Sequence, residues 1–241
     1  MDLKGVILAG GTGTRLKPLT KVTNKHLLPI GRKPMIYYPI EKLTSIGLEE
    51  ILIVTGIEHM GDVVSLLGSG KDFGCRFTYK VQDEAGGIAQ ALALAENFAN
   101  QCNIVVILGD NIFKDNLKSY ADKFNNQQTG ARLLLKKVDD PKRFGVAEIE
   151  GDRIISINEK PEKPKSNYAV TGIYFFDASV FDIIRTLKPS ARGELEITDV
   201  NNAYIAKKQL TYDILEGWWT DAGTFESLIR ANELVEKEPP Q

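Results

Sequence analysis

A glycine-rich turn near the start of the chain could hold a phosphate group. The turn contains Gly10, Gly11 and Gly13, is followed by Arg15, and comes directly after the apolar run of residues 4–9. Glycines let backbone N–H groups converge on an anion, and a guanidinium can bind phosphate oxygens through two parallel hydrogen bonds. The turn lacks the third glycine of the dinucleotide-binding fingerprint, and the chain has no GxxxxGK[ST] sequence, which disfavours NAD and Walker-type ATP binding. A purely structural turn is the alternative.

A single carboxylate, that of Asp110, follows another apolar run, residues 104–109, which ends in glycine. In α/β proteins, ligands bind beyond the carboxyl ends of the strands, so we expect the Asp110 side chain in a ligand crevice. A carboxylate at that place suits a metal ligand. A role in a turn or as a helix cap is the structural alternative.

The elements that must position these residues alternate between strands and helices. Each predicted strand is short and apolar, and each predicted helix has apolar residues at helical spacing. Strands this apolar are typical of a parallel sheet covered on both faces, so the first half predicts a doubly wound α/β fold with a mostly parallel, Rossmann-like sheet. The predicted strands are residues 4–9, 50–55, 77–81, 104–108 and 132–138, and the predicted helices are residues 35–46, 61–67, 88–98 and 116–125.

The second half of the chain departs from this alternation. Residues 146–149 and 153–157 flank the turn sequence Glu150-Gly151-Asp152 and predict a β-hairpin, so the whole sheet should be mixed. No linker or repeat separates the halves, which predicts a single domain over residues 1–241. The remaining predicted elements are a strand at residues 169–176 and helices at 178–187, 197–207 and 225–236.

Composition and charge exclude several classes of protein. The 241 residues are 43% hydrophobic, and 30 basic against 32 acidic residues leave a formal charge of −2, so we expect no nucleic-acid or membrane partner. The two cysteines lie 27 residues apart without a CxxC pair, which disfavours a disulfide framework or zinc site. The early apolar run is too short for a signal segment or membrane span, so we expect a cytoplasmic protein. A homo-oligomer is compatible with the sequence.

The residues after the glycine turn complete a longer and more specific pattern. Residues 10–30 read GGxGTRLxPLTxxxxKxLLPI, which resembles the signature of sugar-1-phosphate nucleotidyltransferases. Further motifs in matching order extend the resemblance over nearly the whole chain. They are VQ at 81–82, GGIAQA at 86–91, LGDN at 108–111, FGV at 144–146, EKP at 159–161, AVTG at 169–172, RGELEITD at 192–199 and WTDAGT at 219–224.

The resemblance implies a nucleotide-binding half over about residues 1–110. Arg15 and Lys25 match positions that bind the triphosphate and offset the charge that builds on the leaving pyrophosphate. Gln82 matches the base-reading residue, and Gly87 would let the base approach the backbone. The implied nucleotide-binding residues are Leu8, Gly10, Gly11, Thr12, Gly13, Thr14, Arg15, Lys25, Gln82, Gly87 and Asp110.

The same resemblance implies a sugar-phosphate-binding half over about residues 111–241. Lys160 matches the lysine that binds the sugar 1-phosphate, an anionic nucleophile that needs positioning rather than a base. Asp221 matches the second carboxylate that, with Asp110, holds Mg²⁺ against the α-phosphate. The implied sugar-phosphate residues are Asn111, Gly145, Glu159, Lys160, Val170 and Glu194, and the implied catalytic residues are Arg15, Lys25, Asp110, Lys160 and Asp221.

Three places depart from the family pattern, and one of them is Lys114-Asp115-Asn116, which stands where longer members have a glycine-rich segment. His26 stands where a glutamine is expected, and Asp83 and Glu84 follow Gln82 where a proline is usual. The Gln82 amide can donate to O4 and accept from N3–H of thymine or uracil. Because a side-chain amide can also turn over to match cytosine, Gln82 indicates a pyrimidine only weakly.

The resemblance implies a complete reaction. A nucleotidyl group is expected to move from dTTP to α-D-glucose 1-phosphate, giving dTDP-glucose and pyrophosphate for deoxysugar, such as dTDP-rhamnose, and surface-glycan synthesis. A UTP-using enzyme is one alternative, because nothing in the sequence singles out the thymine methyl group. A catalytically silent nucleotide-sugar-binding subunit is the other.

Overall fold

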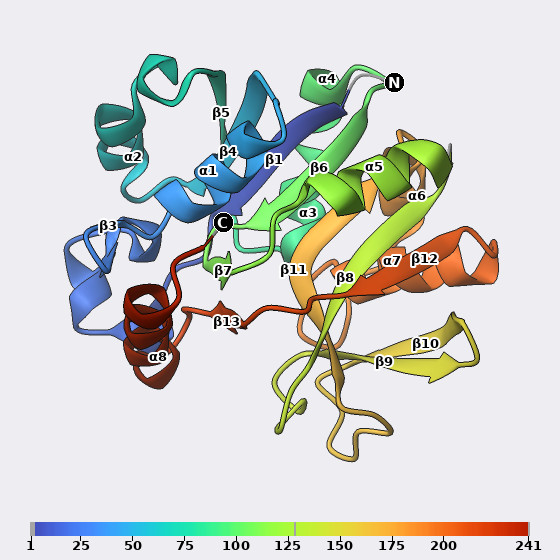
Figure 1. The fold of residues 1–241 in the computed structure, drawn as a ribbon. Coiled ribbons are helices and arrows are strands. Elements are labelled where there is room, and N and C mark those ends of the chain that lie inside the picture. Colours follow the sequence, from blue (N-terminus) through green and yellow to red (C-terminus); the bar gives the residue numbers. More distant parts are fainter. Residues whose placement is uncertain (1–2, 128, 241) are drawn as a thin grey trace.

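In the computed structural model, which describes residues 3–127 and 129–240, strands from both halves of the chain join one nine-stranded sheet (Figure 1). The main path runs β10-β9-β11-β6-β1-β4-β5, and β8 pairs with both β11 and β12. These strands are β1 (Leu3–Ala9), β4 (Glu50–Gly56), β5 (Arg76–Gln82), β6 (Asn103–Leu108), β8 (Ala131–Lys137), β9 (Gly145–Glu150), β10 (Arg153–Glu159), β11 (Tyr168–Phe176) and β12 (Leu210–Ile214).

The first half of the sheet is parallel. Strand β1 lies between β4 and β6, and β5 pairs with the outer edge of β4, each pair parallel. The strand order therefore reverses at β1, and a crevice for ligands is expected beyond the carboxyl ends of β1 and β6. The glycine turn follows β1 and Asp110 follows β6, so the topology brings both to this crevice.

The second half adds antiparallel strands. Strand β11 runs antiparallel to β6, β8 and β9, and β9 and β10 form the predicted hairpin. Strand β12, which the sequence did not predict, pairs parallel with β8. The doubly wound, mixed α/β fold predicted from the sequence is confirmed.

Helices cover both faces of the sheet, and alternate residues of each strand face opposite layers. Val6 and Leu8 pack into a core with α3, α6 and α7, whereas Ile7 and Ala9 pack into a core with α1, α2 and α5. This double burial explains why the strands are almost entirely apolar. The helices are α1 (Tyr37–Ser45), α2 (Met60–Leu67), α3 (Ile88–Ala93), α4 (Glu96–Ala99), α5 (Lys118–Gln127), α6 (Val180–Thr186), α7 (Ile197–Ala206) and α8 (Phe225–Lys237).

The single helix predicted for residues 88–98 is wrong, because the structure divides this segment into α3 and α4. The amides of Leu94 and Ala95 bond to carbonyls three residues back, those of Ala91 and Leu92. The chain tightens there into a 3₁₀-type turn, which interrupts the α-helical bonding.

A small two-stranded sheet brings a segment from near the C-terminus to the crevice. Strand β13 (Trp219–Asp221) pairs antiparallel with β7 (Asn111–Phe113), and Asp221 is opposite Asn111. Helix α8 follows β13 and packs against it with Ala231, in an apolar cluster that also contains Ile112. Two short strands, β2 (Pro29–Ile30) and β3 (Lys33–Pro34), pair with each other beside this small sheet. Within the described ranges, no helix is long and apolar enough to span a membrane.

Candidate active site

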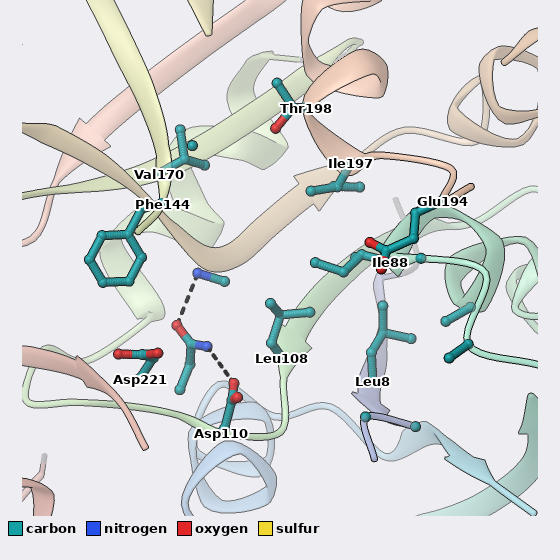
Figure 2. Close-up of a pocket in the computed structure, with 18 of the residues that line it drawn as sticks. Leu8, Ile88, Leu108, Asp110, Phe144, Val170, Glu194, Ile197, Thr198 and Asp221 are labelled. Atoms are coloured by element: carbon teal, nitrogen blue, oxygen red, sulfur yellow. Dashed lines mark hydrogen bonds between the residues drawn. The ribbon is translucent and has the colours of Figure 1, made fainter. Parts of the chain in front are cut away.

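A cavity of about 390 Å³ lies at the carboxyl ends of β1 and β6 (Figure 2). Every residue predicted for the site lines this cavity, except Gly13 and Thr14. Segments from β1 to β13 therefore converge on one space. Its predicted lining residues are Leu8, Gly10, Gly11, Thr12, Arg15, Lys25, Gln82, Gly87, Asp110, Asn111, Gly145, Glu159, Lys160, Val170, Glu194 and Asp221.

Gly13 and Thr14 shape the turn from outside the cavity lining. Gly13 has a left-handed backbone, with φ of 63°, and its carbonyl accepts hydrogen bonds from the Leu16 amide and the Thr20 hydroxyl. A Cβ at Gly13 would lie 2.8 Å from Cγ2 of Thr20, so the turn needs glycine for both conformation and space. The short 3₁₀ helix that Thr14 opens carries Arg15 to the cavity.

Lys25 and Asp110 form a partly buried ion pair at one end of the cavity. Lys25 lies on a short 3₁₀ helix, Lys25–Leu27, which the Asn24 side chain caps by accepting from the His26 amide at 2.9 Å. The Lys25 Nζ is 2.6 Å from Oδ2 of Asp110. Burial by itself would raise the pKa of Asp110, but Lys25 and a hydrogen bond from Asn111 hold it well below its ordinary value. Asp110 is therefore a stable carboxylate.

Asp221 faces the same end of the cavity from strand β13, as Figure 2 shows beside Asp110. A Cβ placed on Gly223 would lie 3.4 Å from a carboxylate oxygen of Asp110 and 3.4 Å from one of Asp221. Both carboxylates therefore border the space beside Gly223. Burial and the nearby charge of Asp110 raise the pKa of Asp221 to about 6, against the opposing effect of Arg143.

Asn111 links the turn that carries Asp110 to the strands β11 and β13. Its Nδ2 donates to Asp110 Oδ1 at 3.0 Å, and its Oδ1 accepts from the Gly172 amide at 2.9 Å and from Trp219 Nε1 at 2.7 Å. The first two bonds are drawn in Figure 2. All three are buried or partly buried, so they fix Asp110 relative to β11 and β13.

The donor set at this end fits a divalent cation shared with a substrate. Asp110 and Asp221 face one open space, and burial raises the pKa of Asp221 because its charge is incompletely compensated. Among residues 3–127 and 129–240, no group of three or more histidine, cysteine or acidic residues could hold a metal alone. Mg²⁺ commonly binds through one or two carboxylates together with substrate phosphates and water. The residues present therefore fit such an ion.

Glu159 ends β10 and Lys160 follows it, and both side chains line the cavity. Lys160 has a left-handed backbone with φ of 42°, which its amide supports by donating to the Phe144 carbonyl at 3.0 Å. Its Nζ lies 3.4 Å from Oε1 of Glu159, while Thr198 donates to Oε2 of Glu159 at 2.6 Å. A non-glycine residue held in this conformation is typical of a position where side-chain direction matters.

His26 lines the cavity next to Lys25. Its side chain is 1% exposed, and Nδ1 lies 2.7 Å from the Asn24 side-chain oxygen. Burial, followed by the charge of Lys25, lowers the pKa of His26 to about 3. The residue that departs from the family pattern is therefore neutral at pH 7, and Gly109 leaves room for its ring, since a Cβ there would be 2.7 Å from Cδ2 of His26.

The glycine end of the cavity is narrow. Gly87 has φ of 100°, and a Cβ at this position would lie 2.4 Å from the Leu195 carbonyl oxygen. A Cβ at Gly10 would lie 2.5 Å from Oε1 of Gln82. Both positions therefore need glycine, and Leu8 and Ile88 provide apolar surface beside them (Figure 2).

Arg143 and Thr198 are among the polar residues of the cavity that sequence reasoning missed. Arg143 donates to Asp221 Oδ2 at 3.2 Å, and its guanidinium lies 5.6 Å from the ring centroid of Phe144. The available signals were a basic residue directly before the FGV motif and a threonine within the RGELEITD motif. Neither signal shows that Arg143 reaches a carboxylate of another strand.

The chain belongs to the nucleotidyl transferase family, whose model matches residues 4–238. The resemblance inferred from the motifs is thereby confirmed. Among curated relatives, the glucose-1-phosphate thymidylyltransferase of Neisseria meningitidis is 46% identical over 238 residues, 97% of this chain and 83% of the relative. That of Mycolicibacterium smegmatis is 42% identical over 97% of this chain and 82% of the relative.

Solved structures share this fold. A Bacillus anthracis protein assigned as a glucose-1-phosphate thymidylyltransferase, crystallised with sucrose, has a TM-score of 0.94 and 63% identity over 97% of this chain and 95% of its own. A UDP-glucose pyrophosphorylase in complex with UDP-glucose has a TM-score of 0.86 and 27% identity over 98% of this chain and 99% of its own. The thymidylyltransferase likeness is the stronger of the two.

Proposed function

We propose that this protein transfers a thymidylyl group from dTTP to α-D-glucose 1-phosphate, giving dTDP-glucose and pyrophosphate. The observation that carries the proposal is the single cavity in which the glycine turn, two facing carboxylates and Lys160 meet. The substrates are inferred from its relatives, which are named glucose-1-phosphate thymidylyltransferases. The product would feed deoxysugar and surface-glycan synthesis.

The proposed chemistry is a direct displacement at the α-phosphorus of the nucleotide. A phosphate oxygen of glucose 1-phosphate forms a bond to the α-phosphorus, and the bond from that phosphorus to the α,β-bridging oxygen breaks. The electron pair of the broken bond leaves on pyrophosphate. Since the attacking phosphate is already anionic, the residues need only align the reactants and compensate charge.

Each charged residue has a part in this alignment. Arg15 and Lys25 would contact the triphosphate and offset the charge that grows on pyrophosphate. Lys160 would hold the sugar phosphate, and Glu159 and Glu194 are placed to accept hydrogen bonds from sugar hydroxyls. These two groups of residues come from the two halves of the chain, which we propose act as one domain.

Asp110 and Asp221 would hold Mg²⁺. When bound, the ion would neutralise charge on the α-phosphate and orient it. Lys25 and Arg143 offset part of the charge of the two carboxylates, through contacts of 2.6 Å and 3.2 Å. Nucleoside triphosphates and sugar phosphates are cytoplasmic metabolites, which supports the expected location. Assembly into a homo-oligomer stays a prediction.

A substrate matrix tests the proposal. Pyrophosphate release is measured with dTTP, UTP, dATP and dGTP, each paired with the 1-phosphates of glucose, galactose, mannose and N-acetylglucosamine in excess Mg²⁺. We expect the highest kcat/KM for dTTP with glucose 1-phosphate. Equal or better turnover with UTP would instead support a uridylyltransferase, and nucleotide binding without any pyrophosphate release would support a silent binding subunit.

A further inference from the structure

The side chain of Gln82 at the end of β5 has both of its N–H donors engaged within the protein. Its Nε2 donates to Oε1 of Gln90 at 2.8 Å and to the Gly87 carbonyl at 3.3 Å. A primary amide nitrogen carries two donors, so none is left for a ligand. Gln82 is 9% exposed, and among the described residues none donates to its Oε1, which points at Gly10 on the cavity wall. Gln82 therefore offers the cavity an acceptor.

The orientation of Gln82 depends on Gln90, the third residue of helix α3. The Oε1 of Gln90 also accepts from the Gly86 amide at 3.0 Å, which fixes this oxygen toward Gln82. A Cβ on Gly86 would lie 2.3 Å from Cδ of Gln90, so the Gln90 amide packs directly against the backbone of Gly86. If the Gln82 amide turned over, its oxygen would face two acceptors, the Gln90 oxygen and the Gly87 carbonyl. Three oxygen acceptors would then face one another without a donor, and buried polar groups left unpaired in this way cost free energy.

We infer that Gln90 is a positioning residue that sets the base selectivity of this enzyme by holding Gln82 with its acceptor toward the base. This inference rests on the proposed function, because it takes the base of the nucleotide to lie against Gln82. Thymine and uracil carry an N3–H that can donate to this acceptor. Cytosine has a bare N3, which would face the Gln82 oxygen as a second acceptor.

The arrangement changes what the sequence alone predicts for Gln82. An amide free to turn over would accept cytosine as readily as thymine, and it would donate to O4 of the base. With both N–H groups held by Gln90 and Gly87, the donation to O4 is not available and the turnover is opposed. The Gln82 contact thus selects bases with a central N–H donor, and this contact by itself gives no discrimination between thymine and uracil.

Three variants test the inference. Gln90→Leu removes the acceptor, and Gly86→Ala displaces the Gln90 amide from the opposite side. Gln90→Glu is the matched control, because a carboxylate still accepts from Gln82 Nε2 and from the Gly86 amide. For each protein, kcat/KM is measured with dTTP and with dCTP at saturating glucose 1-phosphate, and the affinity for each nucleotide alone is measured by calorimetry.

We expect the ratio of kcat/KM for dTTP over dCTP to fall on the order of tenfold to a hundredfold in Gln90→Leu and Gly86→Ala, and to be kept in Gln90→Glu. If Gln90 had only a structural role, its loss would lower kcat/KM for both nucleotides by the same factor and leave their ratio unchanged. An unchanged ratio in both Gln90→Leu and Gly86→Ala would overturn the inference. A wild-type protein that converts no dTTP would refute the proposed function. The calorimetric ratio for dTTP and dCTP would still decide the role of Gln90.

Discussion

At the scale of single residues, the site depends on how neighbouring charges are compensated. Asp110 and Asp221 face one space, yet their pKa values move in opposite directions. Lys25 contacts Asp110 closely at 2.6 Å, whereas Arg143 reaches Asp221 from a more exposed position at 3.2 Å. Asp221 is thus the less compensated carboxylate, and a cation placed between the two would gain most from it.

Replacing either carboxylate by its neutral isostere tests the metal role. We expect Asp110→Asn and Asp221→Asn each to lower kcat/KM on the order of a thousandfold, about 4 kcal/mol of transition-state stabilisation. Binding of Mn²⁺, followed by electron paramagnetic resonance, should weaken in both variants. Asp213→Asn is the control, because Asp213 pairs with Arg132 and Lys123 outside the active-site cavity. Unchanged Mn²⁺ binding in either active-site variant would show that its carboxylate is not a metal ligand.

Removing the Lys160 side chain separates the two substrates. We expect Lys160→Ala to raise the KM for glucose 1-phosphate more than that for dTTP, with some loss of kcat because the bound phosphate is the nucleophile. Lys165→Ala, which removes an exposed lysine paired with Glu148, should leave both KM values unchanged. Steady-state kinetics with each substrate varied in turn checks this. A selective rise in the KM for dTTP would show that Lys160 binds the nucleotide rather than the sugar phosphate.

His26 predicts a pH dependence of stability. Its pKa falls from 6.5 to about 3 on folding, because burial and then Lys25 oppose its charge. Between these values the unfolded chain binds a proton that the folded protein does not, so stability is complete above pH 6.5 and falls as the pH drops toward 3. Urea unfolding at pH 7.5 and 5.0 should show wild type losing about 2 kcal/mol more than His26→Gln. Equal losses would mean that His26 is protonated in the folded protein.

At the scale of elements, the pairing of β7 with β13 is what joins the two carboxylates. This pair brings Asp221 beside Asn111, more than a hundred residues earlier in the chain. Asn111 then ties β13 to β11 through Trp219 and Gly172. The geometry of the metal end is therefore set by strands of only three residues, supported by α8 beneath them.

Truncating Asn111 tests this connection. We expect Asn111→Ala to reduce the free energy of unfolding by about 2–4 kcal/mol, because two buried N–H donors lose their acceptor, and also to lower kcat by loosening Asp110. Asn202→Ala is the control, since Asn202 also joins two segments of the chain, by hydrogen bonds with the amide and the carbonyl of Ile157. Urea unfolding and steady-state kinetics are compared. Normal kcat in Asn111→Ala would show that this network supports the fold but not the reaction.

The sequence predicted the long elements well and the short ones poorly. Strands β1 and β6 were predicted to within a residue because a buried parallel strand is a continuous apolar run. Strands β7 and β13 are too short for any periodicity, and β12 reads Leu-Thr-Tyr-Asp-Ile without a fully buried residue. The break between α3 and α4 falls in an unbroken helix-forming sequence, so only tertiary packing reveals it.

At the scale of the whole molecule, one sheet brings residues from both halves of the chain to a single cavity (Figure 1). Motif resemblance predicted most of the lining, because the motifs lie at or near the ends of strands and helices beside the cavity. It could not predict Arg143, or the contact between Gln82 and Gln90, because these depend on which side chains meet after folding. Contacts of this kind are properties of the assembled fold.

The most direct test of the account follows the oxygen atoms through the reaction. Glucose 1-phosphate labelled with ¹⁸O in its non-bridging phosphate oxygens is incubated with dTTP, Mg²⁺ and enzyme, and the products are examined by mass spectrometry and ³¹P NMR. Direct attack by the sugar phosphate predicts dTDP-glucose that retains all of the label, one labelled atom forming the new bridge, and pyrophosphate without label. Label in pyrophosphate, or no dTDP-glucose at all, would contradict thymidylyl transfer to glucose 1-phosphate in this cavity.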